Sequence, residues 1–250
     1  MSEPQRLSKL MAQRGLCSRR EADRFIEQGL VKVDGKVIDQ LGTKVHPDSH
    51  IELAQEAKQN QKQLVSVILN KPPGYLSGQK ERDKDYRMAV DLVQPKNRWQ
   101  DDTGPAIPNQ MNLAPSGRLD INSSGLIIFT EDGRLAKAVI GKDSQIEKEY
   151  LIRVKGSITP QVIDKLKFGL ELDGRQLRRA KVFKTADDRL RMVLKEGRKR
   201  QIRRMCELVG LEVQSLIRIR VGHLELGDLP QGQWRRLSEA EIQKMIQISK

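Results

Sequence analysis

Cysteine, histidine and aromatic residues are all scarce in this chain of 250 residues. It has two cysteines and three histidines, and Phe, Trp and Tyr together make up 4% of the sequence. Cys17 and Cys206 are too few for the disulfide framework of a secreted domain, and with the histidines they form no spacing typical of a zinc site. We therefore expect a protein of a reducing compartment that holds no metal.

Long apolar segments are also missing. Residues 1–23 are charged throughout and contain no apolar run of roughly 7 to 15 residues, which a secretory signal requires. No later segment approaches the run of about 18 apolar residues that spans a membrane. The sequence therefore predicts a cytoplasmic protein that has no membrane partner.

Basic residues, in contrast, are abundant. The 46 Lys and Arg residues exceed the 33 Asp and Glu residues and leave a net charge of +13, while the apolar content of 37% can supply a core. Such a charge attracts polyanions, of which nucleic acid is the most obvious. Charge alone serves solubility or unspecific association equally well, so the placement of the cations must decide between these roles.

Residues 6–52 have the pattern of a small compact unit. Leu7–Gln13 is expected to form a helix that ends at Gly15, and Ser18 with Glu21 has the form of a capping box that begins a second helix. After that helix, residues 31–37 predict a hairpin with Asp-Gly in its turn. The unit is therefore expected to contain two helices and a hairpin.

Four cations gather on the polar side of these helices, namely Lys9, Arg19, Arg20 and Arg24. Taken alone, such a group is more often a solvated helix face than a binding site. The segment RLSKLMAQRGLCSRREADRFIEQGLVKVDGKV, however, resembles the S4 domain, a small RNA-binding module. The resemblance implies an S4-like domain at residues 5–53 and makes the four cations RNA contacts.

The rest of the chain is expected to form a second, larger domain. Residues 54–63 are polar and have the composition of a linker, and residues 64–250 follow it. Residues 94–112 contain three prolines and little periodicity, which is typical of a surface loop. The remaining pattern favours an α+β fold, a largely antiparallel mixed sheet with flanking helices. Strands are expected at 64–71, 125–130, 149–154 and 189–194, and helices at 160–168 and 199–209.

Asp120 lies between Gly117 and Gly125, in an irregular segment that leads into an apolar strand. Functional groups are often displayed at such a loop edge. Nevertheless, a single aspartate there is more often a turn or cap residue than a catalyst. The spacing of this motif alone therefore does not assign chemistry to Asp120.

Two further segments carry side chains that suit a binding site. Tyr150 lies on an expected strand, where a tyrosine is usually a core residue whose hydroxyl finds a partner. Residues 198–204 combine five cations with the apolar Ile202 at the start of an amphipathic helix, a pattern that favours an anion site over a merely solvated face.

Together these segments resemble pseudouridine synthases of the Rsu type, the family that includes RsuA-like and RluF-like enzymes and joins an S4 domain to a catalytic domain. The motifs that carry the resemblance are, in chain order, LNKPPGYLSG, GRLDINSSGLIIFTEDG, KEYL, EGRKRQIRRMCELVG and LPQGQWRRL. The resemblance covers nearly the whole chain. It implies an enzyme that isomerises uridine to pseudouridine in RNA and needs no cofactor.

The same resemblance assigns roles to single residues. It makes Asp120 the catalytic aspartate, Tyr150 the side chain that stacks on the target base, and Arg203 the cation paired with Asp120, with Ile202 packed against the base. Arg118 and Lys71 are further candidates for site organisation or phosphate contact. RNA contacts are also expected from Arg198, Lys199, Arg200 and Arg204.

Several alternatives stay open. A carboxylate at position 120 suits a nucleophile that attacks the sugar or base, and equally a base that takes a proton from the ribose. The motifs lie closest to the RluF-like branch, so we expect a monomer that acts on large-subunit ribosomal RNA, with transfer RNA or small-subunit RNA as alternatives. A non-catalytic, ribosome-associated S4 protein would share the charge pattern, and a DNA-binding helix-turn-helix at residues 7–28 is a weaker alternative.

Overall fold

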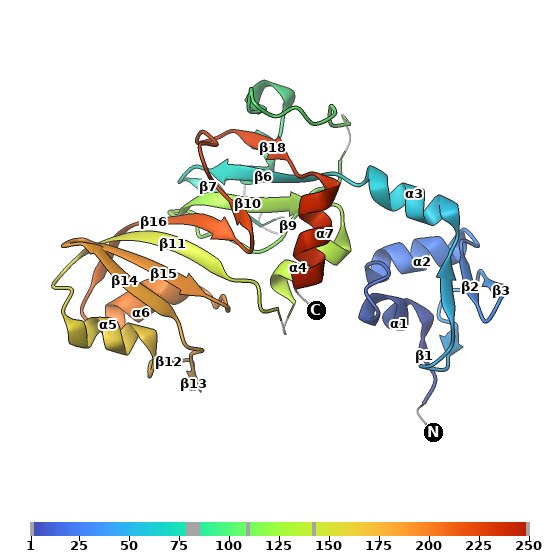
Figure 1. The fold of residues 1–250 in the computed structure, drawn as a ribbon, viewed down its shortest axis with the longest axis horizontal. Coiled ribbons are helices and arrows are strands. Elements are labelled where there is room, and N and C mark those ends of the chain that lie inside the picture. The colour runs from blue at the N-terminus through green and yellow to red at the C-terminus, as the bar shows by residue number, and fades with distance from the viewer. Residues whose placement is uncertain (1–2, 79–85, 109–110, 142–143, 249–250) are drawn as a thin grey trace.

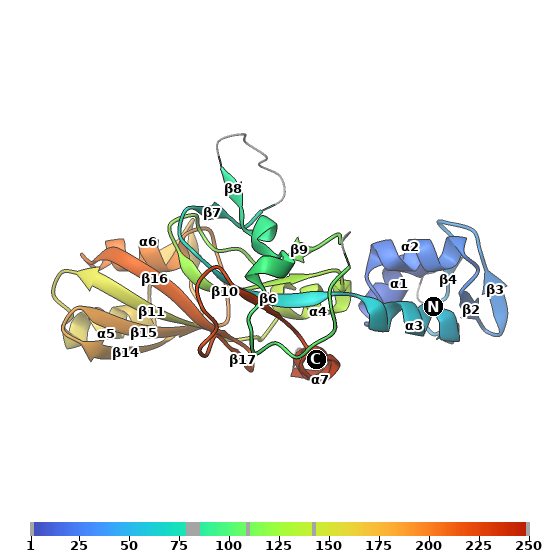
Figure 2. The same ribbon diagram turned by 90° about the horizontal axis from the view of Figure 1, so that it is seen from above.

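The computed structural model describes residues 3–78, 86–108, 111–141 and 144–248. The chain forms a small N-terminal domain and a larger sheet domain, which lie side by side along the long axis of the molecule (Figures 1 and 2). The elements of the first part are β1 Gln5–Arg6, α1 Leu7–Gln13, α2 Arg19–Glu27, β2 Val31–Val33, β3 Lys36–Ile38, β4 Lys44–Val45, β5 Ile51–Leu53 and α3 Gln55–Gln63.

Local sequence signals set the N-terminal domain. The Ser18 hydroxyl accepts a hydrogen bond from the Glu21 amide at 3.2 Å, and the Glu21 carboxylate accepts one from the Ser18 amide at 2.9 Å, so the predicted capping box is confirmed. Asp34 and Gly35 adopt positive φ angles of 49° and 81° in the turn of the predicted hairpin. β5 adds a third strand beside β2, which the sequence did not predict.

The predicted linker, residues 54–63, contains the helix α3. Its Ala57 and Gln61 are buried, and the Gln61 amide donates to the carbonyl of Leu16 at 2.8 Å. The polar composition concealed this helix because only one short apolar side chain and one glutamine face the domain. The connection between the two domains is therefore a helix that packs against the N-terminal domain.

The larger domain is built on a mixed, largely antiparallel sheet, as predicted. Its strands run in the order β14-β15-β11-β16-β10-β6-β18, with β17 beside β16 and β9 beside β10, and β10 with β16 is its parallel pair. The strands of this domain are β6 Ser66–Lys71, β7 Tyr75–Leu76, β8 Arg87–Met88, β9 Ala114–Pro115, β10 Ser124–Thr130, β11 Lys148–Lys155, β12 Glu171–Leu172, β13 Arg175–Gln176, β14 Lys181–Ala186, β15 Arg189–Leu194, β16 Glu212–Val221, β17 Leu224–Glu225 and β18 Trp234–Arg236.

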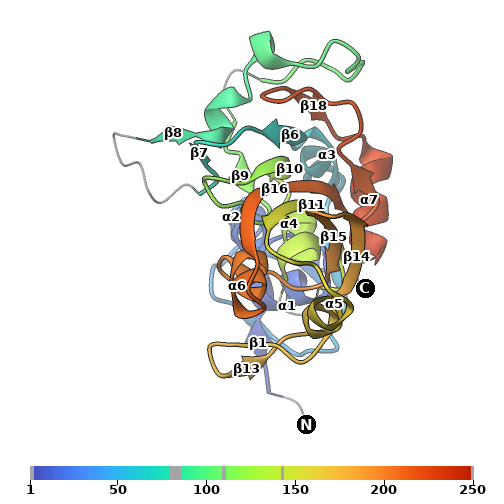
Figure 3. The same ribbon diagram turned by 90° about the vertical axis from the view of Figure 1, so that its left-hand side faces the viewer.

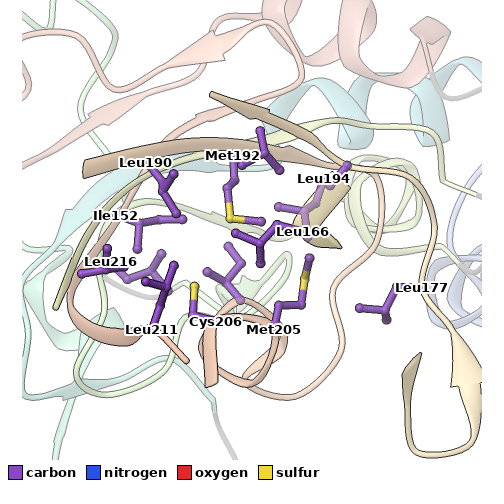
Figure 4. Packing of buried hydrophobic residues seen from close by; sticks show 14 of the residues in the cluster. Ile152, Leu166, Leu177, Leu190, Met192, Leu194, Met205, Cys206, Leu211 and Leu216 are labelled. Carbon is purple, nitrogen blue, oxygen red and sulfur yellow. The ribbon is translucent and has the colours of Figure 1, made fainter. Parts of the chain in front are cut away.

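Helices cover this sheet in two separate places. They are α4 Gly133–Ile140, α5 Pro160–Lys167, α6 Gln201–Leu208 and α7 Glu239–Ile248, with the 3-10 turns η1 Ala89–Leu92 and η2 Pro95–Asn97. α5 and α6 lie on one side of β11, β14, β15 and β16 (Figure 3). Figure 4 shows the cluster between them, in which Ile152 and Leu190 of the sheet face Met205 and Cys206 of α6. α4 and α7 pack together against β6 and β10.

The proline-rich segment, residues 94–112, has little regular structure beyond η2, as predicted for a loop, although residues 109–110 lie outside the described part. It is nevertheless fixed to the sheet. Arg98 pairs with Asp102 at 2.9 Å, and the Trp234 indole donates to the carbonyl of Gln94 at 2.8 Å. The loop therefore packs on β18 at the edge of the domain.

Candidate active site

A cavity of about 790 Å³ lies where several parts of the sheet domain meet. Its wall includes the loop from Gly117 to Ser123, Lys148 and Tyr150 of β11, the start of α6, and Leu216 with Arg218 of β16. Basic side chains outnumber acidic ones in this wall: Arg118, Lys148, Arg178, Lys195, Arg198, Lys199, Arg200, Arg203 and Arg218 stand against Asp120 and Glu196. The cavity therefore attracts an anionic ligand.

The backbone around Asp120 is held from both sides. Ser77 accepts a hydrogen bond from the Leu119 amide at 3.2 Å and donates one to the Leu119 carbonyl at 2.9 Å. On the other side, the Ser123 amide donates to the Asp120 carbonyl at 3.0 Å. These bonds fix a carboxylate in the cavity wall with 29% of its side chain exposed. The backbone of Asp120 is thus fixed, while its carboxylate is accessible from the cavity.

Arg203 approaches Asp120 from α6. Its Nε lies 3.8 Å from the carboxylate, and its side chain is 11% exposed. Its other nitrogens donate to the carbonyls of Val213 at 3.3 Å and Asn122 at 3.1 Å, which leaves Nε buried without a hydrogen-bond partner in the described part of the chain. Burial lowers the pKa of the guanidinium. A buried cation therefore lies beside the carboxylate of Asp120.

An apolar surface lies beside this ion pair. Tyr150 is half-buried on β11 and packs against the hydrophobic clusters on both sides of it, and Ile202 is buried on α6. Both side chains line the cavity. The structure therefore brings together Asp120, Tyr150, Ile202 and Arg203, which come from three separate segments of the sequence. A planar ring of a ligand could therefore contact the apolar surface and the charged groups at the same time.

Lys71 was predicted either to organise the site or to contact a phosphate of the RNA. It is fully buried, and its ammonium donates to the carbonyls of Pro72, Tyr75 and Ile121 at 2.8, 2.9 and 3.3 Å. Burial lowers its pKa to about 8, and the nearby Asp120 opposes part of that shift. Full burial is incompatible with a phosphate contact, whereas the hydrogen bond to Ile121 agrees with the other predicted role, support of the loop that carries Asp120.

The cations of residues 198–204 divide into two kinds. Lys199 and Arg200 are exposed in the cavity wall. Arg198 instead donates to the carbonyls of Leu172, Arg175 and Gln176, and so ties down the β12–β13 hairpin. Arg204 makes a two-pronged ion pair with Asp173 and is not part of the cavity wall. Two of the predicted RNA contacts thus use their donors within the protein.

Arg118 and the cations of the N-terminal domain remain accessible. Arg118 is exposed in the cavity wall, next to Asp120 in sequence. Lys9, Arg19, Arg20 and Arg24 are exposed on α1 and α2, and within the described residues none of the four forms an ion pair. Their charges are therefore free to meet a polyanion.

The sequence analysis assigned no role to Arg218 or Lys148, although both line the cavity. Arg218 is 4% exposed and donates to the carbonyls of Leu126 at 2.7 Å and Arg118 at 3.4 Å. Lys148 donates to the carbonyl of Val139 at 3.0 Å, and burial, assisted by Arg218, lowers its pKa to about 8. Lys148 was visible in the KEYL motif, whereas the burial of Arg218 depends on strand pairing across the whole domain.

No group of three or more His, Cys, Asp or Glu side chains suited to a metal ion is found within the described ranges. Over the same ranges, no helix is long and apolar enough to cross a membrane.

Comparison with known proteins gives two matches to protein families. Residues 65–208 match the family described as RNA pseudouridylate synthase, and residues 5–51 match the S4 domain. The first match contains Asp120, Tyr150, Ile202 and Arg203, and the second contains the exposed cations of α1 and α2.

Individual relatives extend over most of the chain. The chain is 35% identical over 245 residues to the dual-specificity RNA pseudouridine synthase RluF of Escherichia coli K12, covering 97% of this chain and 79% of that one. It is 34% identical over 247 residues to the ribosomal large subunit pseudouridine synthase B of Bacillus subtilis 168, covering 96% and 95%. A solved pseudouridylate synthase shares the fold with a TM-score of 0.64 at 22% identity, covering 96% of this chain and 99% of that one.

Proposed function

The chain belongs to the RNA pseudouridine synthase family and isomerises uridine to pseudouridine in RNA, and we propose that Asp120 is the residue that carries out this reaction. The observation that supports this role most directly is the position of its carboxylate: rigid, partly exposed in a basic cavity, and 3.8 Å from the buried guanidinium of Arg203.

The isomerisation suits a carboxylate. The N1–C1′ bond of uridine breaks, a C5–C1′ bond forms, the hydrogen on C5 is lost and N1 gains one, so the reaction has no net redox change. Asp120 serves either as a nucleophile that holds the sugar or base, or as the base that takes and returns a ribose proton. In both cases the ionised form reacts, and the adjacent guanidinium of Arg203 balances its negative charge while RNA displaces water from the cavity.

The target base must leave its stack to reach Asp120. We assign the stacking contact to Tyr150 and the apolar contact on the base to Ile202, because both side chains line the cavity beside the carboxylate. Stacking on an aromatic ring restores about 1 to 3 kcal/mol per base, which offsets part of the cost of extrusion.

The accessible cations suit the RNA backbone. Arg118, Lys199 and Arg200 are exposed around the cavity, and Lys9, Arg19, Arg20 and Arg24 are exposed on the N-terminal domain. We propose that the first group holds the phosphates near the target and that the second holds a more distant part of the same RNA. Phosphate contacts of this kind position an RNA but do not read its sequence.

The proposed substrate is large-subunit ribosomal RNA. This proposal is supported by the Bacillus subtilis relative, a ribosomal large subunit pseudouridine synthase, and by the extent of the match, which covers 95% of that protein. The dual specificity of RluF favours a second RNA class, and we propose transfer RNA as the one to examine. A cytoplasmic location and a monomeric state, as expected from the sequence, belong to the same proposal.

Mapping pseudouridines tests the substrate and Asp120 together. Ribosomal and transfer RNA are compared from cells with the gene, without it, and without it but supplied with Asp120→Asn. We expect a pseudouridine of large-subunit RNA to be absent without the gene, restored by the unchanged protein and not by Asp120→Asn. Restoration by the variant would contradict the catalytic role; a lost site in another RNA would contradict only the substrate.

A further inference from the structure

Two cations flank Tyr150 in the wall of the cavity. Lys148 precedes Tyr150 by two residues on β11, and Arg218 is the partner of Tyr150 across the β11–β16 pair. All three residues line the cavity. The β11–β16 register shifts between Glu149 and Tyr150, so strand alternation alone does not place Lys148 beside the ring. Arg218, however, pairs with Tyr150 and lies close enough to Lys148 to lower its pKa. The two cations and the ring therefore lie in one part of the cavity wall.

These cations carry charge that the protein itself does not neutralise. The hydrogen bonds of Lys148 and Arg218 go to backbone carbonyls, and no carboxylate in the described part of the chain forms an ion pair with either. Arg218 is 4% exposed, and its Nη2 is buried without a hydrogen-bond partner among the described residues. Burying an unpaired cation costs free energy. Lys71 is also held by carbonyls alone, but it lies outside the cavity wall and has a carbonyl for each of its three ammonium hydrogens. Lys148 and Arg218 face the cavity instead, and this position favours an anion supplied by the substrate.

The substrate offers two anions, its phosphates and the uracil itself. When the N1–C1′ bond breaks, its electron pair stays with the uracil, and the negative charge is shared between N1 and the two carbonyl oxygens. The phosphates have exposed partners in Lys199 and Arg200. Lys148 and Arg218, in contrast, are more deeply placed and adjoin the tyrosine to which we assign the base. The position of this pair favours the uracil.

We propose that Lys148 stabilises the uracil anion formed on cleavage of the N1–C1′ bond, with Arg218 as its positioning residue. The inference rests on the proposed function, since it needs the base beside Tyr150. Lys148 stays protonated throughout: the electron pair that leaves C1′ returns when C5 attacks C1′, after which C5 loses its proton and N1 gains one. Preorganised donors aimed at charge that develops in the transition state act in this way.

Arg218 acts through its neighbours. By donating to the carbonyls of Leu126 and Arg118, it links β10 to the loop that carries Asp120. Its positive charge also lies close enough to lower the pKa of Lys148. It therefore ties the loop of Asp120 to the sheet and adds to the positive potential around Lys148.

The test compares Lys148→Met with the unchanged protein in single-turnover reactions and in RNA binding. We expect the rate constant to fall by about a hundredfold, which is typical of one lost electrostatic donor, while the dissociation constant and its salt dependence stay the same. Lys148→Arg keeps the charge and is expected to recover part of the rate. Lys155→Met, at the exposed far end of the same strand, is the matched control and should leave the rate unchanged.

Two results would overturn the inference. The first is a wild-type rate constant in Lys148→Met. The second is weaker RNA binding by Lys148→Met with a salt slope lower by about one unit, because such a change marks a phosphate contact. If the methionine variant does not fold, Lys148→Gln removes the charge but keeps a donor for Val139. Loss of activity in Asp120→Asn together with a wild-type rate in the Lys148 variants would refute this inference alone. Full activity of Asp120→Asn would refute the proposed function.

Discussion

Replacing Arg203 with methionine removes the guanidinium whose Nε lies 3.8 Å from the carboxylate of Asp120. At that separation, an effective dielectric constant of about 20 gives an attraction of roughly 4 kcal/mol between unit charges. Because the Asp120 side chain is 29% exposed, water screens part of this attraction. We therefore take about 2 to 4 kcal/mol as the loss, which corresponds to a rate constant lower by roughly 30 to 1,000-fold.

Single-turnover reactions measure this effect best, because they report the chemical step separately from product release. RNA tritiated at C5 of uridine releases the label when pseudouridine forms, so the released counts give the rate constant. Arg203→Lys keeps a cation but cannot reproduce the donors to Val213 and Asn122, and it should fall between the wild type and the methionine variant.

The control is Arg153→Met on β11, which removes an exposed arginine from its ion pair with Asp188 outside the cavity wall. Its rate should equal that of the wild type. Thermal unfolding of each variant shows whether Arg203→Met remains folded. A folded Arg203→Met protein with a rate within threefold of the wild type would refute the role given to this ion pair.

Three further predictions concern binding and stability. Arg19→Gln, Arg20→Gln and Arg24→Gln together should weaken RNA binding and lower its salt slope by about two to three units, as measured by binding titrations at several salt concentrations; an unchanged slope would exclude these contacts. Gly125→Ala should destabilise the protein by several kcal/mol in urea unfolding, because φ is +101° and a Cβ would overlap with the backbone of Arg218; wild-type stability would contradict the tight β10–β16 contact. Folding lowers the pKa values of Lys71 and Lys148 from 10.5 to about 8. Between pH 8 and 9 the unfolded chain therefore binds more protons at these two lysines than the folded protein does. As a result, the two lysines make the free energy of unfolding rise with pH. Lys148→Met should reduce that rise by up to about 1.4 kcal/mol per pH unit, and an equal rise in both proteins would count against a depressed pKa.

The parts of the fold that depend on neighbouring residues were predictable from the sequence. Ser18 with Glu21, and Asp34 with Gly35, are short signals whose residues lie close together in the sequence, and each formed the expected cap or turn. The helix α3 was missed because its own sequence has no helical pattern of apolar residues. The contacts that hold it are made with the N-terminal domain.

The candidate site also has residues that the sequence predicted and residues whose placement depends on distant parts of the chain. Ordered motifs identified Asp120, Tyr150 and Arg203, and the structure brings them to one cavity. A phosphate contact was one of two roles predicted for Lys71, and its burial could not be foreseen because one of the three carbonyls that hold its ammonium belongs to Ile121, fifty residues away. Arg218 was missed because its burial results from the pairing of β16 with β10 and β11, which lie far from it in sequence.

The catalytic role of Asp120 is tested by the single-turnover rate of Asp120→Asn on RNA that the variant binds as tightly as the wild type does. Asparagine keeps the size of the side chain but removes the charge that faces Arg203. We expect the variant to bind the RNA with wild-type affinity and to form no detectable pseudouridine. Pseudouridine formed at the wild-type rate would contradict the catalytic role.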